Sequence, residues 1–481
     1  MKEINLFIRN SLKIICLILI DLSAFYVCLF LAYYLRKYIL PLLLNNLPVF
    51  YFSYMHFISL IWIPSIFIFF LFYEGLYDRN LPFWDETRSI VKSTSLSSVT
   101  SMSIVTLGKM GDDVSRIVLL GLWFSSLFIF PLFRLQGKRL LFSFSVFKDP
   151  AIIIGAGNAG KLVLAGLKRE KHMGFDIIGF LDDNETIIGK SINGVKVLGK
   201  IADYPNITKN KFIKTAILAI PTLPSDRLSA LTTFIQSKTP NTMIIPDLKG
   251  IAILNTELFH LFTEEIFLMN IRNNLKSATN RLIKTTFDLL MSIILIPIIL
   301  PLLIIISIII KLETKGPAIY THERIGKNGK TFKCYKFRTM YKDAEERLRR
   351  LLESSEEFKA EWENNWKLKD DPRVTRIGRF LRKTSLDELP QILNVIKQEM
   401  SLVGPRPYLL REKESIIESM SIICSARPGI TGLWQVSGRS NTDYKNRIKL
   451  DSWYVINWSL WLDVVILLKT IKVVLKAEGA Y

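Results

Sequence analysis

The sequence of 481 residues has little cysteine and little histidine, with four residues of each. No two cysteines form a CxxC pair, and Cys16 and Cys28 lie within an apolar stretch. A disulfide framework and a thiolate zinc site are therefore excluded. The histidines lie far apart in the sequence, without the i, i+4 spacing with which one helix binds a metal, and we interpret each as structural.

Negative charge is also scarce relative to positive charge. Lys and Arg number 63 against 43 Asp and Glu, which gives a formal net charge of +20. Such an excess of positive charge suits binding to a nucleic acid, an anionic lipid surface or a phosphorylated substrate. The sequence contains no recognisable nucleic-acid-binding module, so nucleic acid is not an expected partner. Hydrophobic residues make up 49% of the chain and the mean hydropathy is +0.27, which excludes a disordered chain and predicts a membrane protein.

Four apolar stretches precede the first soluble region, near residues 11–35, 50–72, 94–107 and 117–133. About 20 apolar residues span a bilayer, so we expect four transmembrane helices in a domain of residues 1–147. The third stretch is rich in Ser and Thr, but without it the chain would cross the membrane an odd number of times. The domain that follows would then lie outside the cell. Basic residues before the first stretch, between the second and third, and after the fourth place those segments in the cytosol.

Residues 148–276 change to short β-rich runs separated by helix-like stretches. This alternation predicts a Rossmann-like α/β domain with a parallel sheet, and the expected strands cover residues 151–154, 176–181, 215–220 and 242–245. The first strand leads into Gly155, Gly157 and Gly160, with two aspartates about 20 residues further on, as in a dinucleotide-binding turn. Such glycines also serve any tight strand-to-helix turn, so a bound cofactor and a purely structural role both remain open.

An apolar run at about residues 285–310 begins the third domain, residues 277–481. Pro297 and Pro301 interrupt it, and two prolines at this spacing kink or break a helix. Basic residues flank both ends, which favours a re-entrant hairpin that enters one leaflet and returns. The alternative, a fifth crossing, would place everything that follows outside the cell.

The segment 373–407 gathers five basic residues immediately before two adjacent acids, Asp387 and Glu388. One interpretation is structural: Ser385 and Glu388 match a capping box at the start of a helix. The other is functional, because a carboxylate at a helix start among arginines stays ionised, can bind Mg²⁺ and can attack a phosphorus atom. The two interpretations are compatible.

Two further basic segments lie in the same domain, the motif KFRTM at residues 336–340 and a glycine-punctuated loop at residues 427–439. Guanidinium groups suit phosphate, and the aromatic Trp434 in the loop suits stacking on a base or sugar. The candidate ligands of a substrate phosphate or nucleotide are Lys336, Arg338, Arg382, Arg406, Arg427, Gln435 and Arg439.

The sequence from residue 281 to residue 481 resembles the bacterial sugar transferase family, the monotopic phosphoglycosyl transferases. The resemblance rests on KFRTM, on SLDELPQILNVIKQEMSLVGPRP and on ARPGITGLWQVSGR, which cover the catalytic core of that family. The four expected spans and the Rossmann-like domain resemble the long form of the family. The resemblance implies that Asp387 and Glu388 are the catalytic dyad, and that Lys336, Arg382 and Arg406 are its characteristic basic residues.

The same resemblance implies the activity, namely transfer of a hexose 1-phosphate from a UDP-sugar to undecaprenyl phosphate. UDP-galactose is the expected donor, UMP the product, an aspartyl phosphosugar the covalent intermediate and Mg²⁺ the cofactor, held by Asp387 and Glu388. This reaction is the first membrane step of O-antigen, capsule or exopolysaccharide synthesis. It implies a multi-pass protein of the bacterial inner membrane with its catalytic domain in the cytosol, and it leaves homodimerisation open.

The expected fold is thus a multi-domain membrane protein with four transmembrane helices, a Rossmann-like α/β domain and a mainly helical α/β catalytic domain containing a re-entrant helix. One alternative function is that of a membrane-anchored nucleotide-sugar dehydratase. Such an enzyme needs a Tyr-x-x-x-Lys pair for proton transfer, and no tyrosine after Gly160 has a lysine four positions on. A non-catalytic membrane scaffold or regulator is the second alternative.

Overall fold

The computed structural model describes residues 2–44, 47–210, 212–247, 256–261, 266–271, 273–354, 358–359, 371–437 and 444–476. The chain forms two compact units, residues 1–249 and 250–481. Of the predicted site residues, Arg439 lies outside the described residues.

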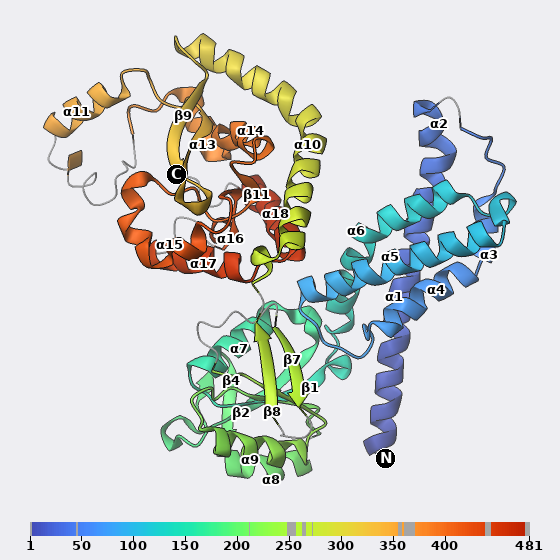
Figure 1. The fold of residues 1–481 in the computed structure, drawn as a ribbon. Coiled ribbons are helices and arrows are strands. Elements are labelled where there is room, and N and C mark those ends of the chain that lie inside the picture. Colours follow the sequence, from blue (N-terminus) through green and yellow to red (C-terminus); the bar gives the residue numbers. More distant parts are fainter. Residues whose placement is uncertain are drawn as a thin grey trace. The chain divides into compact units, whose positions relative to one another are not determined.

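The first unit begins with long helices (Figure 1), which follow the apolar stretches of the sequence. They are α1 (Lys2–Tyr34), continued by a π-helical turn (Leu35–Ile39) and α2 (Leu40–Leu43), then α3 (Tyr54–Ser59), α4 (Trp62–Tyr73), α5 (Phe83–Leu107) and α6 (Arg116–Leu141). Helix α6 packs along α1 and α5. Large apolar side chains remain exposed on the outer faces of α1, α4 and α6, as expected for helices that face lipid.

Among the described residues, three helices are long and apolar enough to cross a membrane, namely Ile8–Leu43, Arg116–Leu141 and Ala278–Glu313. The first two coincide with the first and fourth expected spans. The second expected span, residues 50–72, contains the apolar helix α4, which has only 12 residues. The third expected span, residues 94–107, lies within α5, whose buried face carries small polar side chains such as Ser93 and Ser97. The number of four crossings therefore stays a prediction.

Charged side chains inside this helical region pair with one another. Arg134 on α6 binds Asp21 on α1 at 2.8 Å and Glu86 on α5 at 3.1 Å, and all three are buried. Lys13 on α1 binds Asp149, the first residue of the sheet that follows, at 3.1 Å. Because a buried charge without a partner is costly, these pairs fix how the helices meet each other and the sheet.

The α/β part of the first unit confirms the Rossmann-like prediction. Its strands are β1 (Asp149–Ile154), β2 (Phe175–Leu181), β3 (Ser191–Ile192), β4 (Val195–Gly199), β5 (Thr215–Leu218) and β6 (Asn241–Ile244), and its helices are α7 (Asn158–Arg169), α8 (Tyr204–Asn210) and α9 (Ser225–Gln236). The sheet has the order β3-β4-β2-β1-β5-β6, and all neighbours except β3 and β4 are parallel. Strand β1 is buried on both faces: Ile153 packs on the side of α7, and Ile152 and Ile154 pack on the side of α8 and α9.

The second unit contains a short hairpin of β7 (Thr256–Leu261) and β8 (Ile266–Ile271) and then the long helix α10 (Ala278–Glu313). The elements that follow are β9 (Ile319–Ile325), β10 (Thr331–Phe337), α11 (Ala344–Ser354), α13 (Arg376–Thr384), the 3-10 segment η9 (Leu386–Gln391), α14 (Ile392–Ile396), β11 (Ser401–Val403), the 3-10 segment η10 (Leu410–Glu412), α15 (Met420–Ile423), β12 (Gly429–Thr431), α16 (Leu433–Val436), α17 (Tyr444–Ile456) and α18 (Leu460–Lys476). Strands β9 and β10 are antiparallel, and β11 and β12 are parallel. This mixture matches the expected mainly helical α/β domain.

Helix α10 contains Pro297 and Pro301 and is visibly bent (Figure 1). In its first arm, Lys284 binds Asp463 on α18 at 2.7 Å and Asp288 at 3.2 Å. In its second arm, Ile306 and Ile310 join the buried cluster that contains Ala318, Phe337 and Leu381. Both arms therefore dock on the same unit.

Candidate active site

The two adjacent acids lie on η9, directly after α13. Ser385 ends α13 with a left-handed backbone, φ +57°, and turns the chain into the 3-10 segment that contains Pro390. The capping-box interpretation is wrong: the Ser385 side chain caps none of the described backbone N–H groups at the start of this segment. The left-handed turn takes the serine out of the extended conformation that a capping residue needs, and the Glu388 side chain bonds elsewhere.

Glu388 is held by the basic strand β10. The Lys336 ammonium donates to Glu388 Oε1 at 2.5 Å, and both side chains are partly exposed. Burial opposes ionisation of Glu388, but Lys336, with Arg406 and Arg324, outweighs it and holds the pKa of this carboxyl below its usual range. Glu388 is therefore a carboxylate at neutral pH.

Asp387 has the opposite electrostatic environment. Burial, followed by the charge of Glu388, raises the pKa of Asp387 to about 6, although Lys336 and Arg382 act against this rise. Arg382, in the last turn of α13, is fixed by a bond from its Nε to Thr339 Oγ1 at 3.0 Å. The adjacent acids thus have different proton affinities, with a guanidinium anchored beside one and an ammonium beside the other.

Arg406 approaches from the turn between Pro405 and Pro407. Its guanidinium lies 5.3 Å from the centre of the Trp434 ring, and its backbone N–H donates to Asp451 Oδ2 at 3.3 Å. The positive charge of Arg406 lowers the pKa of Glu388. The structure therefore brings together five of the predicted residues, Lys336, Arg382, Asp387, Glu388 and Arg406.

The other predicted ligands have contacts elsewhere. Arg338 donates to the backbone of Thr314 and Lys315 at the end of α10, and Arg427 donates to Thr285 and Gln398. The side-chain amide of Gln435 donates to the Ile430 carbonyl, and its oxygen is buried without a partner among the described residues. Trp434, 9% exposed, has two guanidinium groups near its ring, which gives no support to base stacking there. Substrate binding by Arg338, Arg427, Gln435 and Arg439 stays a prediction.

Sequence reasoning missed Arg324, which is buried on β9 and donates to the Pro407 carbonyl at 3.3 Å. In the hairpin, Arg324 pairs with Phe332 and Tyr320 with Lys336, so Arg324 and Lys336 lie on one face. The charge of Arg324 also lowers the pKa of Glu388. The alternating pattern of residues 319–325 carries this signal, but only once the strand is paired with KFRTM.

Two further residues that sequence reasoning missed, Arg447 and Asp451, lie one turn apart on α17. Asp451 accepts from the Tyr408 hydroxyl at 2.7 Å and from the backbone of Arg406, and Arg447 binds Glu412 at 3.0 Å. Burial raises the pKa of Asp451 to about 7. These contacts tie the turn that carries Arg406 to a helix about 40 residues away in sequence, a long-range pairing that no local motif indicates.

Mg²⁺ binding by the dyad stays a prediction, and the residues present can be compared with what the ion requires. Among the described residues, no group of three or more His, Cys, Asp or Glu side chains could hold a metal ion. Mg²⁺ keeps several water ligands and binds substrate phosphates through one or two protein carboxylates, so a dyad is sufficient. The charge of Glu388 raises the pKa of Asp387, and a cation between the two carboxylates would relieve that repulsion. The residues present therefore fit Mg²⁺.

The glycine turn of the first unit divides into two kinds of position. Gly155 has φ +98°, and a Cβ on Gly160 would lie 2.0 Å from the Gly155 carbonyl oxygen, so the fold itself requires both glycines. Around Gly157, in contrast, no heavy atom of the described residues lies within 4 Å of an added Cβ. Packing explains Gly155 and Gly160, and cofactor binding at the turn stays a prediction.

Comparison with known proteins identifies the family. Residues 279–477 match the bacterial sugar transferase family, and residues 74–246 match the family described as CoA-binding domain. The chain is 38% identical over 405 residues to undecaprenyl-phosphate galactose phosphotransferase of Salmonella typhimurium, covering 84% of each protein. The chain belongs to the bacterial sugar transferase family.

Two further relatives of this sugar transferase are informative. The UDP-galactose-lipid carrier transferase of Erwinia amylovora is 38% identical over 408 residues, with 84% of each chain covered. The exopolysaccharide production protein ExoY of Sinorhizobium fredii is 46% identical over 198 residues, which are 41% of this chain and 88% of that one. The protein is therefore an enzyme of the sugar transferase class, and the dehydratase alternative is not favoured. Its family and its apolar helices together indicate a membrane location.

Proposed function

We propose that this sugar transferase moves galactose 1-phosphate from UDP-galactose to undecaprenyl phosphate and releases UMP. The observation that carries the proposal is the convergence of Lys336, Arg382 and Arg406 on the adjacent acids Asp387 and Glu388. The printed names of the Salmonella and Erwinia relatives support galactose as the sugar, UDP-galactose as the donor and the undecaprenyl carrier as the acceptor.

The chemistry follows from the dyad in two steps. A carboxylate oxygen of Asp387 attacks the β-phosphorus of the donor, and the bond from that phosphorus to the bridging oxygen breaks, so UMP leaves with the electron pair. The product is an acyl phosphate that links Asp387 to galactose. The undecaprenyl phosphate oxygen then attacks the same phosphorus and regenerates the Asp387 carboxylate. Lys336 and Arg382 neutralise charge on the oxygens of the transferred phosphoryl group.

Glu388 supports the second step. Lys336 and Arg406 hold its pKa below the usual range, so Glu388 stays ionised and orients the cations that receive the incoming lipid phosphate. Asp387 and Glu388 would also hold Mg²⁺, which supplies positive charge to the donor phosphates when bound. Because the transfer takes place in two steps, one site can bind the soluble donor first and the lipid acceptor afterwards.

The topology that fits this reaction has four crossings near the N-terminus, a re-entrant α10, and a catalytic unit on the cytosolic face of the bacterial inner membrane. The bend at Pro297 and Pro301 and the docking of both arms of α10 on one unit support re-entry. A helix that crossed the bilayer would carry its two ends to opposite sides. The enzyme would then catalyse the first membrane step of a surface polysaccharide.

The test is incorporation of label into lipid. Membranes containing the protein are incubated with undecaprenyl phosphate and UDP-galactose, UDP-glucose or UDP-N-acetylglucosamine, each labelled in the sugar and used separately. Label from UDP-galactose should enter the organic phase in the wild type and not in Asp387→Asn. Preferred incorporation from another donor would replace galactose as the sugar, and failure with all donors would overturn the proposed reaction.

A further inference from the structure

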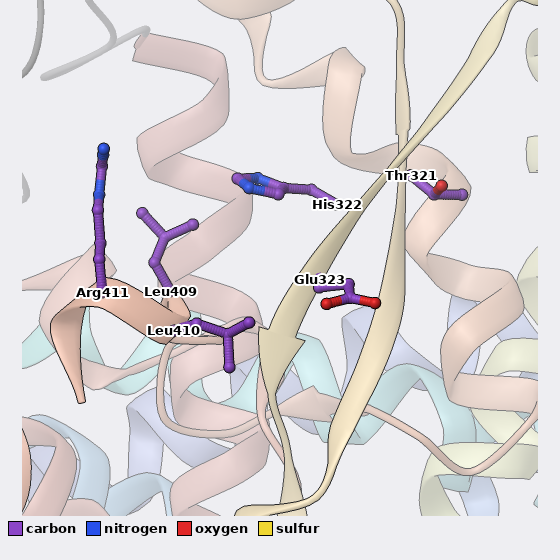
Figure 2. Close-up of a pocket in the computed structure, with 6 residues that line it drawn as sticks. All are labelled: Thr321, His322, Glu323, Leu409, Leu410 and Arg411. Carbon is purple, nitrogen blue, oxygen red and sulfur yellow. The ribbon is translucent and has the colours of Figure 1, made fainter.

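A pocket lies beside β9, on the side away from β10. It is lined by Thr321, His322, Glu323, Leu409, Leu410 and Arg411, and its volume is about 480 Å³ (Figure 2). This size is within the range of small-molecule sites, roughly 300–1,000 Å³. Figure 2 shows the His322 ring directed from the strand toward Leu409 and Arg411. We call this site the β9 pocket.

Strand register connects the β9 pocket to the dyad. Tyr320 pairs with Lys336 and His322 with Cys334, so the side chains of His322 and Lys336 lie on one face of the hairpin. Two residues along an antiparallel strand correspond to roughly 7 Å. Lys336 binds Glu388, and His322 lies two residues along β9 from the partner of Lys336. The β9 pocket therefore begins close to the dyad.

The course of β9 shows in which direction the β9 pocket lies from the dyad. Its beginning lies against the second arm of α10, where Ala318 and Phe337 pack on Ile306 and Ile310. Figure 1 shows β9 running away from the end of α10, and its last residue, Ile325, pairs with Tyr408. The β9 pocket is thus displaced from the dyad along β9, away from the C-terminal end of α10.

The charges around the β9 pocket are mainly positive, although the acidic Glu323 is also part of its lining. Burial lowers the pKa of His322, and Arg324, Lys336 and Arg411 lower it further, while Glu323 acts in the opposite direction. Three cationic side chains therefore act on one imidazole. Leu409 and Leu410 add an apolar wall, which suits a flat ring or a ribose beside a phosphate.

We propose that the β9 pocket binds the nucleoside monophosphate part of the sugar donor. Arg411 and His322 contact the α-phosphate, Leu409 and Leu410 pack against the nucleoside, and the sugar-bearing β-phosphate lies at the dyad. The assignment rests on the proposed transferase function. It places the leaving UMP along β9, away from the C-terminal end of α10, and leaves the side of that end for the lipid phosphate.

The kinetic test uses the two half-reactions of the full-length enzyme. In His322→Gln and Arg411→Gln, the KM for UDP-galactose should rise about tenfold or more, the usual cost of one charge-assisted hydrogen bond to phosphate. The KM for undecaprenyl phosphate should remain unchanged. The matched control is Lys333→Gln, which removes one positive charge from an exposed position of β10 whose partner is Glu323.

Direct binding of UMP to the purified full-length protein, measured by titration calorimetry, separates this inference from the proposed function. Both pocket variants should bind UMP about tenfold more weakly than the wild type and the control. Unchanged UMP affinity, or a higher KM for undecaprenyl phosphate alone, would overturn the assignment. A wild type that binds UMP through His322 and Arg411 but transfers no sugar phosphate would overturn the transferase proposal and leave the ligand class of the pocket standing.

Discussion

Asp387 and Glu388 are neighbours in the chain, yet their surroundings give them different chemistry. Glu388 is bound to Lys336, and its carboxylate form is stabilised by three cations. Asp387 is desolvated and is repelled by Glu388, so its carboxylate is less stabilised. A less stabilised carboxylate is the better nucleophile, which supports the proposed attack by Asp387.

Replacement of the nucleophile should stop the first half-reaction. Asp387→Asn preserves size but offers no anionic oxygen, so the rate should fall by about a thousandfold or more, a barrier increase of about 4 kcal/mol. Wild-type enzyme given labelled UDP-galactose without lipid should release a burst of UMP and retain label, and the variant should do neither. Asp343→Asn, which changes an exposed residue just before α11, is the control. If wild-type UMP appeared only with lipid present and no bound label could be trapped, direct in-line transfer would replace the covalent mechanism.

The pH dependence of UMP release should report the proton on Asp387. The attacking group is the carboxylate, so the rate should fall as the pH drops through a pKa of about 6. In Glu388→Gln the repelling charge is lost, and the pKa of Asp387 should decrease, so the residual rate should persist to lower pH. The measurement is the initial rate of UMP release without lipid across the acidic range. An unshifted or upward-shifted acid limb in the variant would contradict this account.

The central residues of the site were predictable, and the residues that support them were not. Asp387, Glu388, Lys336, Arg382 and Arg406 lie in short motifs with an interpretable chemistry. Arg324, Arg447 and Asp451 reach the same site only through strand pairing and helix packing between distant parts of the chain. The capping box failed because a local pattern does not reveal that Ser385 adopts a left-handed backbone.

Helix α10 is the element that decides the topology. Its buried Lys284–Asp463 pair and its second arm at Ile306 and Ile310 attach both ends to one unit. Cysteines introduced in place of Lys276 and Lys330, in a background without the native cysteines, should both be inaccessible to an impermeant thiol reagent in intact cells. Both should react after permeabilisation. Lys109→Cys, expected on the opposite side of the membrane, is the positive control, and labelling at residue 330 from outside would establish a fifth crossing.

The glycine turn after β1 offers a matched pair of substitutions. A methyl group at Gly160 would collide with the Gly155 carbonyl, whereas one at Gly157 would meet open space. Gly160→Ala should therefore destabilise the first unit by about 2 kcal/mol and lower its unfolding temperature, and Gly157→Ala should not. Thermal unfolding of the detergent-solubilised protein measures both. Equal destabilisation by the two variants would show that Gly157 also has a packing role.

The elements differ in how well their sequences predict them. Four strands of the Rossmann-like sheet, β1, β2, β5 and β6, were located closely, because strands such as β1 and β5 are buried apolar runs bounded by turn residues. The short strands β3 and β4 were not predicted. The N-terminal helices were harder to locate, since α5 carries many polar side chains and buries serines against its neighbours. The bend of α10 could be read from its prolines, but the docking of its arms depends on partners distant in sequence.

The two units differ in whether they contain the residues assigned to the reaction. Every residue that we assign to the reaction or to the β9 pocket lies within residues 250–481. The second unit has its own buried cores and contains the whole sugar transferase match, residues 279–477.

This division predicts that the second unit retains the chemistry when it is separated. A protein of residues 273–481 begins ahead of α10, keeps the Lys284–Asp463 pair and preserves every contact of the dyad described above. In membranes it should transfer galactose 1-phosphate to undecaprenyl phosphate at a rate within about tenfold of the full chain, because no catalytic group is lost. The same shortened protein with Asp387→Asn controls for background transfer. A truncated protein that is well folded and membrane-bound but inactive would show that the first unit contributes to the reaction itself, through donor capture or through the placement of α10.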